Sequence, residues 1–175
     1  YYAMELVDGT PLNTYAEQRN LGVRERLRLI EQICQAVQHA HGKGVIHRDL
    51  KPGNLLVDTT GQPRILDFGV ARSTDSDIAL TTIHSDVTTI VGTLPYMSPE
   101  QVSGRSDEID TRSDIYALGV IAYELLTGRL PFDVRGRTLV EAARIITTGT
   151  APSLGATARA LRGDIEVIVG RAMDP

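Results

Sequence analysis

The sequence HRDLKPGN, at residues 47–54, places a carboxylate, an ammonium group and an amide within one short stretch that a proline braces. A carboxylate such as that of Asp49 can accept the proton of an attacking hydroxyl group. The ammonium group of Lys51 can neutralise charge on a phosphate, and the side chain of Asn54 can bind a metal ion. Pro52 stiffens the turn that aims these groups. Together they predict a site for phosphoryl transfer.

The residues that follow this stretch predict a β-hairpin. An apolar run at 55–57 is followed by a turn-rich stretch at 58–63 and then by the sequence ILDFG at 65–69. Short apolar runs on either side of a turn are typical of paired strands. The second predicted strand ends at another carboxylate, that of Asp67.

The order and spacing of HRDLKPGN and the later DFG resemble the catalytic core of the protein kinases. The resemblance implies that Asp49 is the catalytic base and that Lys51 contacts the γ-phosphate of ATP. It also implies that Asn54 and Asp67 hold Mg²⁺. The cofactors implied are therefore ATP and magnesium.

Arg48, beside the implied base, stays protonated and needs an anion as a partner. In kinases of this type the arginine pairs with a phosphate on the activation loop, which implies regulation by phosphorylation. A local carboxylate is the alternative for the unmodified state. Residues 67–100 are rich in Ser, Thr and Asp, which favours a loop and resembles that activation segment. The phosphorylation candidates are the threonine pairs at 88–89 and then at 81–82.

The sequence GTLPYMSPE, at residues 92–100, resembles the substrate-facing end of the activation segment. Thr93 stands where Ser/Thr-specific kinases use a hydroxyl group to bridge the base and the lysine. With Lys51, it implies serine or threonine acceptors in a protein substrate. Ser98 replaces the alanine that is usual in the family, and we interpret it as a tolerated variant. Glu100 is expected to form a buried ion pair with an arginine beyond the last helix predicted in this chain.

The first residues of the chain predict a strand at 1–7 and a turn at 8–11. By resemblance, this segment is the hinge between the two lobes of a kinase domain, where backbone groups bind adenine. The implied adenine-site residues are Met4, Glu5, Val7 and Leu56.

Four stretches show the apolar spacing of helices: 23–40, 114–128, 139–146 and 165–172. The second is apolar on nearly every face and ends in a glycine, so it is expected in the centre of the core. We expect Asp164 to cap the last helix.

Three polar residues lie in these helical patterns. Cys34 is expected to be a buried thiol, and His39 and His41 to be ordinary residues at a helix end rather than metal ligands. By resemblance, Asp114 would accept hydrogen bonds from the backbone near His47 and thereby fix the catalytic loop. A helix-capping role for Asp114 is compatible with this.

Composition narrows the classes of protein to consider. The chain has 175 residues, 42% of them hydrophobic, which is enough to bury one sizeable core. A net charge of −4 gives no reason to expect nucleic acid or an anionic membrane as a partner. A single cysteine fits a reducing cytoplasm, and no apolar run is long enough to span a bilayer. We expect a cytoplasmic segment, from either a free or a membrane-anchored parent.

Three parts of the family's nucleotide site are not found in the chain: a glycine-rich loop, a strand lysine and a helix glutamate. All would precede Tyr1. The resemblance therefore implies a partial kinase catalytic domain over 1–175, with the hinge at 1–12, the larger lobe at 13–175 and the last helix missing. We expect the chain alone to be inactive, because half of the phosphate clamp is absent.

The expected fold is mainly α (α+β overall), a kinase-like larger lobe that is helical with a small β-hairpin. The expected function is transfer of the ATP γ-phosphate to protein Ser/Thr hydroxyls in signal transduction. The stretches 98–101 and 113–132 look most like bacterial members. Two alternatives stay open: a non-catalytic kinase-like module that scaffolds a partner, and a small-molecule phosphotransferase of related fold. The second is disfavoured because residues 92–100 resemble a peptide-docking segment.

Overall fold

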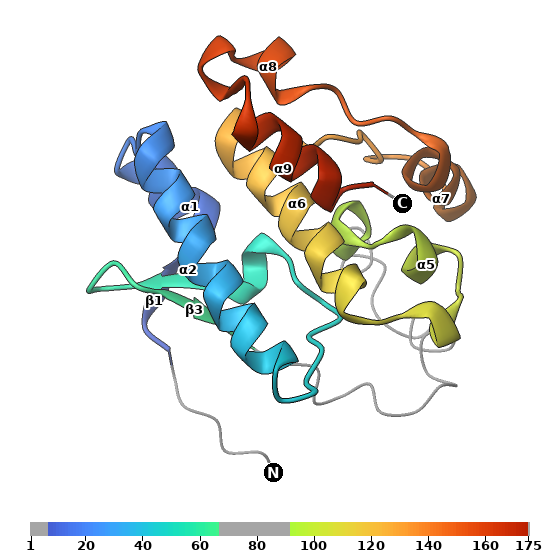
Figure 1. The fold of residues 1–175 in the computed structure, drawn as a ribbon, viewed down its shortest axis with the longest axis horizontal. Coiled ribbons are helices and arrows are strands. Elements are labelled where there is room, and N and C mark those ends of the chain that lie inside the picture. The colour runs from blue at the N-terminus through green and yellow to red at the C-terminus, as the bar shows by residue number, and fades with distance from the viewer. Residues whose placement is uncertain (1–6, 67–91, 175) are drawn as a thin grey trace.

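Helix α6, Thr111–Thr127, is the element around which the other helices are arranged (Figure 1). The structure, a computed structural model, describes residues 7–66 and 92–174. Ten of the 17 residues of α6 are buried, so the helix runs through the interior as its sequence predicts. The Asp110 carboxylate caps its first turn by accepting a hydrogen bond from the Arg112 amide, 2.7 Å away. Gly128, at φ 72°, ends the helix in the left-handed conformation. The alternative role of Asp114 as the cap is therefore wrong.

A three-stranded antiparallel sheet with the order β1-β2-β3 lies beside the helices. Strands β2, Leu55–Asp58, and β3, Pro63–Ile65, form the predicted hairpin. Strand β1, Gly9–Pro11, pairs with β2, so the turn predicted at 8–11 is wrong. Its Gly and Pro are typical of turns, but each also fits this edge strand. The missing amide of a proline is tolerated there, and a Cβ on Gly9 would lie only 3.0 Å from the Val57 carbonyl oxygen.

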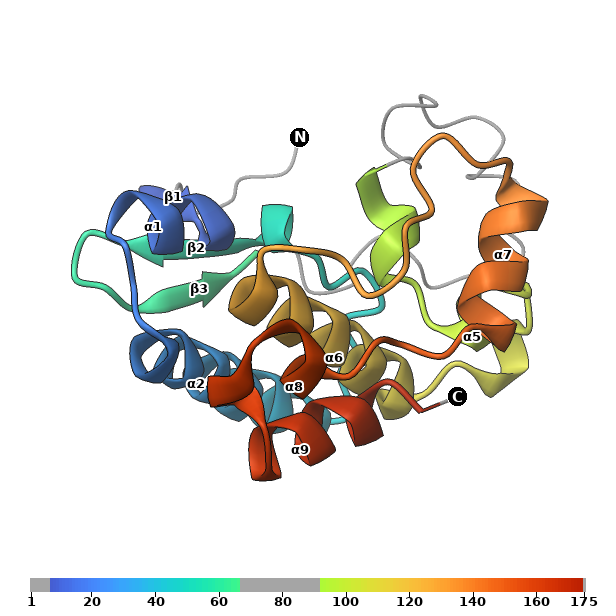
Figure 2. The same ribbon diagram turned by 90° about the horizontal axis from the view of Figure 1, so that it is seen from above.

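Two helices from the first part of the chain pack against this sheet. Figure 2 shows α1, Leu12–Gln18, beside β1 and β2, and α2, Val23–His41, beside β3. Helix α2 also packs against α6 and confirms the helix predicted at 23–40. Cys34, however, is exposed, because the buried stripe of α2 is formed by Leu29, Ile33 and Val37. The prediction of a buried thiol is wrong.

The later helices cover the rest of α6. Helices α5, Pro99–Val102, and α7, Leu139–Thr148, lie together on the opposite side of α6 from α2 (Figures 1 and 2). The short α8, Leu154–Thr157, and the longer α9, Asp164–Ala172, pack along α6. The helices predicted at 139–146 and 165–172 are confirmed.

The start of α9 differs from the prediction in one respect. The residue before the helix is Gly163, whose φ of 100° only glycine adopts readily. Asp164 is the first helical residue, where its charge favours the helix dipole but does not cap it. The prediction of Asp164 as the cap is therefore wrong.

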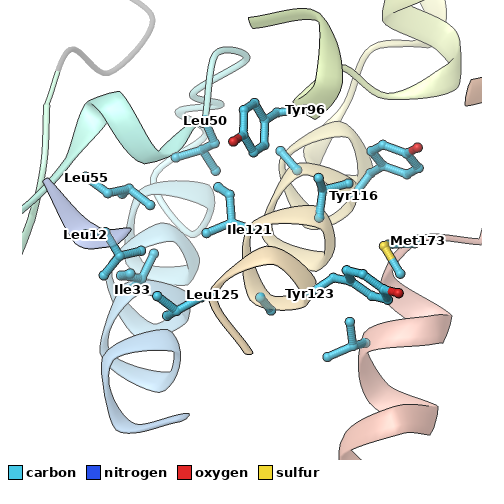
Figure 3. Packing of buried hydrophobic residues seen from close by; sticks show 14 of the residues in the cluster. Leu12, Ile33, Leu50, Leu55, Tyr96, Tyr116, Ile121, Tyr123, Leu125 and Met173 are labelled. Carbon is cyan, nitrogen blue, oxygen red and sulfur yellow. The ribbon is translucent and has the colours of Figure 1, made fainter. Parts of the chain in front are cut away.

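The buried hydrophobic side chains among the described residues form one cluster. Figure 3 shows Leu12, Ile33, Leu55 and Ile121 gathered between α1, α2, the sheet and α6, with Met173 on the far side of α6. This is a mainly helical fold with a small antiparallel sheet, as predicted. In the part of the chain that the structure describes, no helix has the length and apolar character needed to cross a membrane.

Close packing between α6 and α9 leads to a first testable expectation. A Cβ added to Gly119 would lie 2.8 Å from Met173 Cγ and 3.0 Å from Ala172 Cβ. We expect Gly119→Ala to lower the free energy of unfolding by about 1–3 kcal/mol, because the two helices must move apart. Urea unfolding measures the change.

The matched control is Gly170→Ala in α9, where an added Cβ meets nothing within 4 Å. There we expect unchanged or slightly greater stability, because alanine favours a helix by up to about 1 kcal/mol. Equal effects of the two substitutions would contradict the close contact at Gly119.

Candidate active site

The stretch 47–54 forms a loop that joins α2 to the sheet. Helix α2 ends at His41, and Gly44, at φ 76°, turns the chain so that the Val45 amide bonds back to the Ala40 carbonyl, 3.0 Å away. The loop closes in a short 3-10 turn, Pro52–Asn54, which leads directly into β2. The loop is thus held at both ends by regular structure, α2 before it and β2 after it.

Three predicted site residues of this loop, Asp49, Lys51 and Asn54, lie close together, and Thr93 from another part of the chain joins them. Lys51 Nζ lies 3.1 Å from Asp49 Oδ2 and donates a hydrogen bond to Thr93 Oγ1, 2.8 Å away. Asn54 Nδ2 donates to the Asp49 backbone oxygen at 2.8 Å and to Asp49 Oδ2 at 3.2 Å. The Asp49 side chain stays 29% exposed, so an acceptor group can reach it. The result is an oriented carboxylate beside a cation and a hydroxyl group.

Thr93 comes from a distant part of the chain and is buried just before the 3-10 turn Leu94–Tyr96. Tyr96 holds this turn in place because its hydroxyl group donates to Glu124 Oε2 on α6, 2.7 Å away. Asn13 Nδ2 donates to the same oxygen at 3.0 Å. Burial, together with the hydrogen bond to Glu124, raises the pKa of Tyr96 well above its usual range, so the phenol stays protonated. The sequence offered no signal for this anchor.

Asp114, near the start of α6, accepts hydrogen bonds from the backbone of the loop. Its Oδ1 accepts a hydrogen bond from the Arg48 amide and its Oδ2 accepts one from the His47 amide, both at 2.8 Å. Only 1% of Asp114 is exposed, so these donors compensate a buried charge. The predicted hydrogen bonds from the loop backbone to Asp114 are confirmed.

His41 also contacts Asp114, since its Nε2 lies 2.7 Å from Oδ2. His41 is the last residue of α2, as predicted, and this contact is an additional role that the sequence did not indicate. Its role depends on α6 crossing the end of α2, which no local pattern in the sequence encodes.

His47 ties the loop to the end of the hairpin. Its ring is 1% exposed, and Nε2 lies 2.9 Å from the Leu66 carbonyl oxygen while Nδ1 lies 3.3 Å from the Asp49 amide. This network assigns the proton to Nε2, because a carbonyl oxygen only accepts and an amide only donates. Leu66 in turn donates from its backbone to Asn54, at 2.9 Å. The loop therefore has a fixed position relative to β3.

The other predicted site residues are only partly described. Val7 precedes β1, and Leu56 lies on β2 opposite Pro11; both are half-buried. Met4, Glu5 and Asp67 lie outside the described residues, as do the threonine pairs at 81–82 and 88–89.

Asn54, the described member of the predicted metal site, suits a hard cation such as Mg²⁺. Asn54 directs its Nδ2 group to Asp49, which leaves Oδ1 as the atom available for a cation that prefers oxygen ligands.

Glu100 lies beside a polar pocket of about 240 Å³ that Tyr116 and Arg112 also line. It accepts a hydrogen bond from the Ser113 hydroxyl group. Among residues 7–66 and 92–174 it forms no ion pair, and Arg112 pairs with Asp110 instead. The ion pair with a more distant arginine stays a prediction.

Comparison with known proteins agrees with this geometry. The protein kinase domain family matches residues 1–154. The chain is 46% identical over 140 residues to the serine/threonine-protein kinase Pkn1 of Myxococcus xanthus, covering 78% of this chain and 19% of that protein. It is 41% identical over 133 residues to PknA of Mycobacterium tuberculosis, covering 75% of this chain and 29% of that protein. For PrkC of Bacillus subtilis the identity is 42% over 134 residues, with 76% and 20% covered.

All three relatives carry the name serine/threonine-protein kinase and come from bacteria. The chain spans between a fifth and a third of their length. Since the family match covers most of the chain, the chain belongs to the protein kinase domain family.

Proposed function

We propose that the chain is the catalytic lobe of a serine/threonine protein kinase that transfers the γ-phosphate of ATP to protein hydroxyl groups. The observation that carries this proposal is the meeting of Asp49, Lys51 and Thr93 within hydrogen-bond distance on a loop whose backbone Asp114 fixes. The names of the relatives support the same activity.

In the proposed mechanism, Asp49 orients the acceptor hydroxyl group and receives its proton. Lys51, 3.1 Å from that carboxylate, supplies positive charge to the transferring phosphate. The Asp49 carboxylate is partly exposed, so a side chain from a protein substrate can reach it. Because this loop is fixed before the substrate arrives, little reorganisation opposes the reaction.

ATP and Mg²⁺ complete the proposed site. Asn54 and Asp67 would hold the metal ion, which when bound neutralises charge on the ATP phosphates. The backbone of Glu5 and Val7, with the side chains of Met4 and Leu56, would hold adenine. We place the activity in the cytoplasm, because the single cysteine fits a reducing compartment.

Arg48 provides a proposed link to regulation. A phosphate on one of the threonine pairs at 88–89 or 81–82 would give its guanidinium group a strong anionic partner. Pairing with a local carboxylate is the alternative for the unmodified state.

The hydrogen bond from Lys51 to Thr93 gives the proposed role of Thr93 in the site a direct test. In Thr93→Val the hydroxyl group that accepts from Lys51 is lost, while the size of the side chain is kept. We expect kcat of the full-length natural protein towards a serine peptide to fall about tenfold, because a hydrogen bond to a charged group contributes about 1.5–3 kcal/mol. Thr93→Ser keeps the hydroxyl group and is expected to stay near the original rate. An unchanged kcat in Thr93→Val would remove Thr93 from the site.

The experiment that tests the function itself is an acceptor comparison. The full-length natural protein is incubated with Mg²⁺, ATP labelled on the γ-phosphate, and matched peptides that differ only in a Ser, Thr or Tyr acceptor. We expect label on the Ser and Thr peptides and little on the Tyr peptide. Label on sugars or other small alcohols in place of peptides would support a small-molecule phosphotransferase and contradict the proposal.

A further inference from the structure

Gln101 contacts the catalytic loop from a distant part of the chain. It lies on α5, and its Nε2 group donates a hydrogen bond to the backbone oxygen of Arg48, 2.7 Å away and 53 residues earlier. Sequence analysis gave this residue no role. We call residues 92–98 the substrate-facing segment. Gln101 comes shortly after this segment, and its side chain contacts Arg48, the residue before Asp49.

The other end of the Gln101 amide binds that segment. Its Oε1 atom accepts from the Ser98 amide at 3.0 Å and from the Ser98 hydroxyl group at 3.2 Å. Both groups are donors, whereas the Arg48 carbonyl is an acceptor only, so this network assigns the orientation of the amide. Ser98 is fully buried, which excludes water as a competing partner. Gln101 therefore bridges Ser98 to Arg48.

The bridge ends on a strained residue. Arg48 has φ 67°, a left-handed conformation that is uncommon outside glycine and costs on the order of 1–3 kcal/mol. Such a conformation persists only where the surroundings fix it. The Arg48 amide donates to Asp114 at 2.8 Å, and its carbonyl oxygen accepts from Gln101. Both backbone groups of the strained residue are thus held by side chains.

The carbonyl that Gln101 holds belongs to the peptide plane that leads into Asp49. Because a peptide unit is planar, the direction of the Arg48 carbonyl also sets the direction of the Asp49 amide, which lies 3.3 Å from His47 Nδ1. A rotation of this plane would carry the Asp49 amide away from His47 Nδ1 and so release the backbone of Asp49 from that contact. Gln101 therefore restrains the residue that carries the proposed base.

We propose that Gln101 is a positioning residue that couples the substrate-facing segment to the proposed base; the inference rests on the proposed kinase function. The segment is tied to the loop at both ends. At its start Thr93 accepts from Lys51, and at its end Ser98 is joined to Arg48 through Gln101. These contacts and the backbone between them therefore connect Asp49 to both ends of the substrate-facing segment. The peptide-binding surface and the base are thus set in position as one unit.

Gln101→Glu tests the bridge with little disturbance of the fold. Glutamate at this position keeps the oxygen that accepts from Ser98 and so keeps the capping box of α5. It replaces the donor to Arg48 with a carboxylate oxygen, which repels the carbonyl. In the full-length natural protein we expect kcat for a serine peptide to fall about tenfold, with KM for ATP within about twofold of the original value.

A pH series separates positioning from general destabilisation. A protonated glutamic acid can donate to the Arg48 carbonyl again. The ratio of kcat for Gln101→Glu to that of the unmodified protein should therefore rise as the pH falls towards the range where glutamate, with an ordinary pKa of about 4.3, takes up a proton.

Two further variants serve as controls. Gln101→Met fills a similar volume but has neither the donor to Arg48 nor the acceptor for Ser98, so kcat should fall at least as far as in Gln101→Glu and show no recovery at low pH. Gln32→Glu makes the same chemical change on α2, where Nε2 donates only to Gln62 Oε1 at 3.1 Å in an exposed contact, so its kcat should stay near the original value.

Each outcome has a defined meaning. If Gln101→Glu and Gln101→Met both keep the kcat of the unmodified protein, even with a lower melting temperature, Gln101 has a structural role only. That result would overturn the inference and leave the kinase function standing. A full-length protein that is folded but inactive before any substitution would overturn the proposed function, and the inference with it.

Discussion

Asp49→Asn in the full-length natural protein is expected to lower kcat by about 10²- to 10⁴-fold, the range that a general base contributes. The amide is nearly the same size as the carboxylate, and its oxygen can still accept from Asn54. It cannot take up the proton of the acceptor hydroxyl group, and it no longer balances the charge of Lys51. The loss should therefore appear in the rate and not in the fold. Steady-state phosphorylation of a serine peptide measures it.

The matched control is Asp133→Asn, at a carboxylate whose side chain is 81% exposed and 3.7 Å from Arg135. This variant should keep its kcat, because surface ion pairs contribute little. Thermal unfolding and ATP binding should be unchanged in both variants. Turnover at the original rate in Asp49→Asn would remove Asp49 as the base and with it the proposed mechanism.

Asp114→Asn is expected to have the second-largest effect, although its side chain contacts no reacting group. The carboxylate accepts from the amides of both His47 and Arg48, whereas asparagine has one acceptor oxygen and places its NH₂ group against the other amide. Because the site is almost fully buried, the unpaired amide should cost about 1–3 kcal/mol of folding free energy. The resulting displacement of the loop should lower kcat about 10²-fold, as a shift of about 1 Å does in other active sites.

Asp110→Asn provides the control on the same helix. Asparagine caps a helix as well as aspartate does, so neither stability nor kcat should change appreciably. Urea unfolding and peptide phosphorylation are measured in parallel on both variants. A normal kcat in a destabilised Asp114→Asn protein would show that the hydrogen bonds from Asp114 support the fold without orienting Asp49.

The elements that the sequence predicts well are those with a strong local pattern. The apolar faces of 23–40 and 114–128 and the turn between 57 and 63 each decide their own conformation, and the structure confirms them. The contact of Asp114 with the loop was also predicted, but through resemblance to a family and not through local pattern.

The errors arise where contacts between distant segments decide the outcome. Residues 8–11 have the composition of a turn, yet strand β2, more than forty residues later, pairs with Gly9–Pro11. Helical periodicity placed Cys34 near the apolar face but could not show that α6 and α9 leave it exposed. His41 and Gln101 both bind partners more than fifty residues away. Such contacts depend on how elements cross, which the spacing of residues within one element does not encode.

The central claim is best tested by measuring ATP binding and phosphate transfer together on the full-length natural protein. A single sample with Mg²⁺ and γ-labelled ATP is assayed for bound nucleotide and for label on serine and threonine peptides, beside Asp49→Asn. We expect binding in both proteins and transfer only by the unmodified one. A folded protein that binds ATP and a protein partner but transfers no phosphate would contradict the proposed kinase activity and support a non-catalytic scaffold.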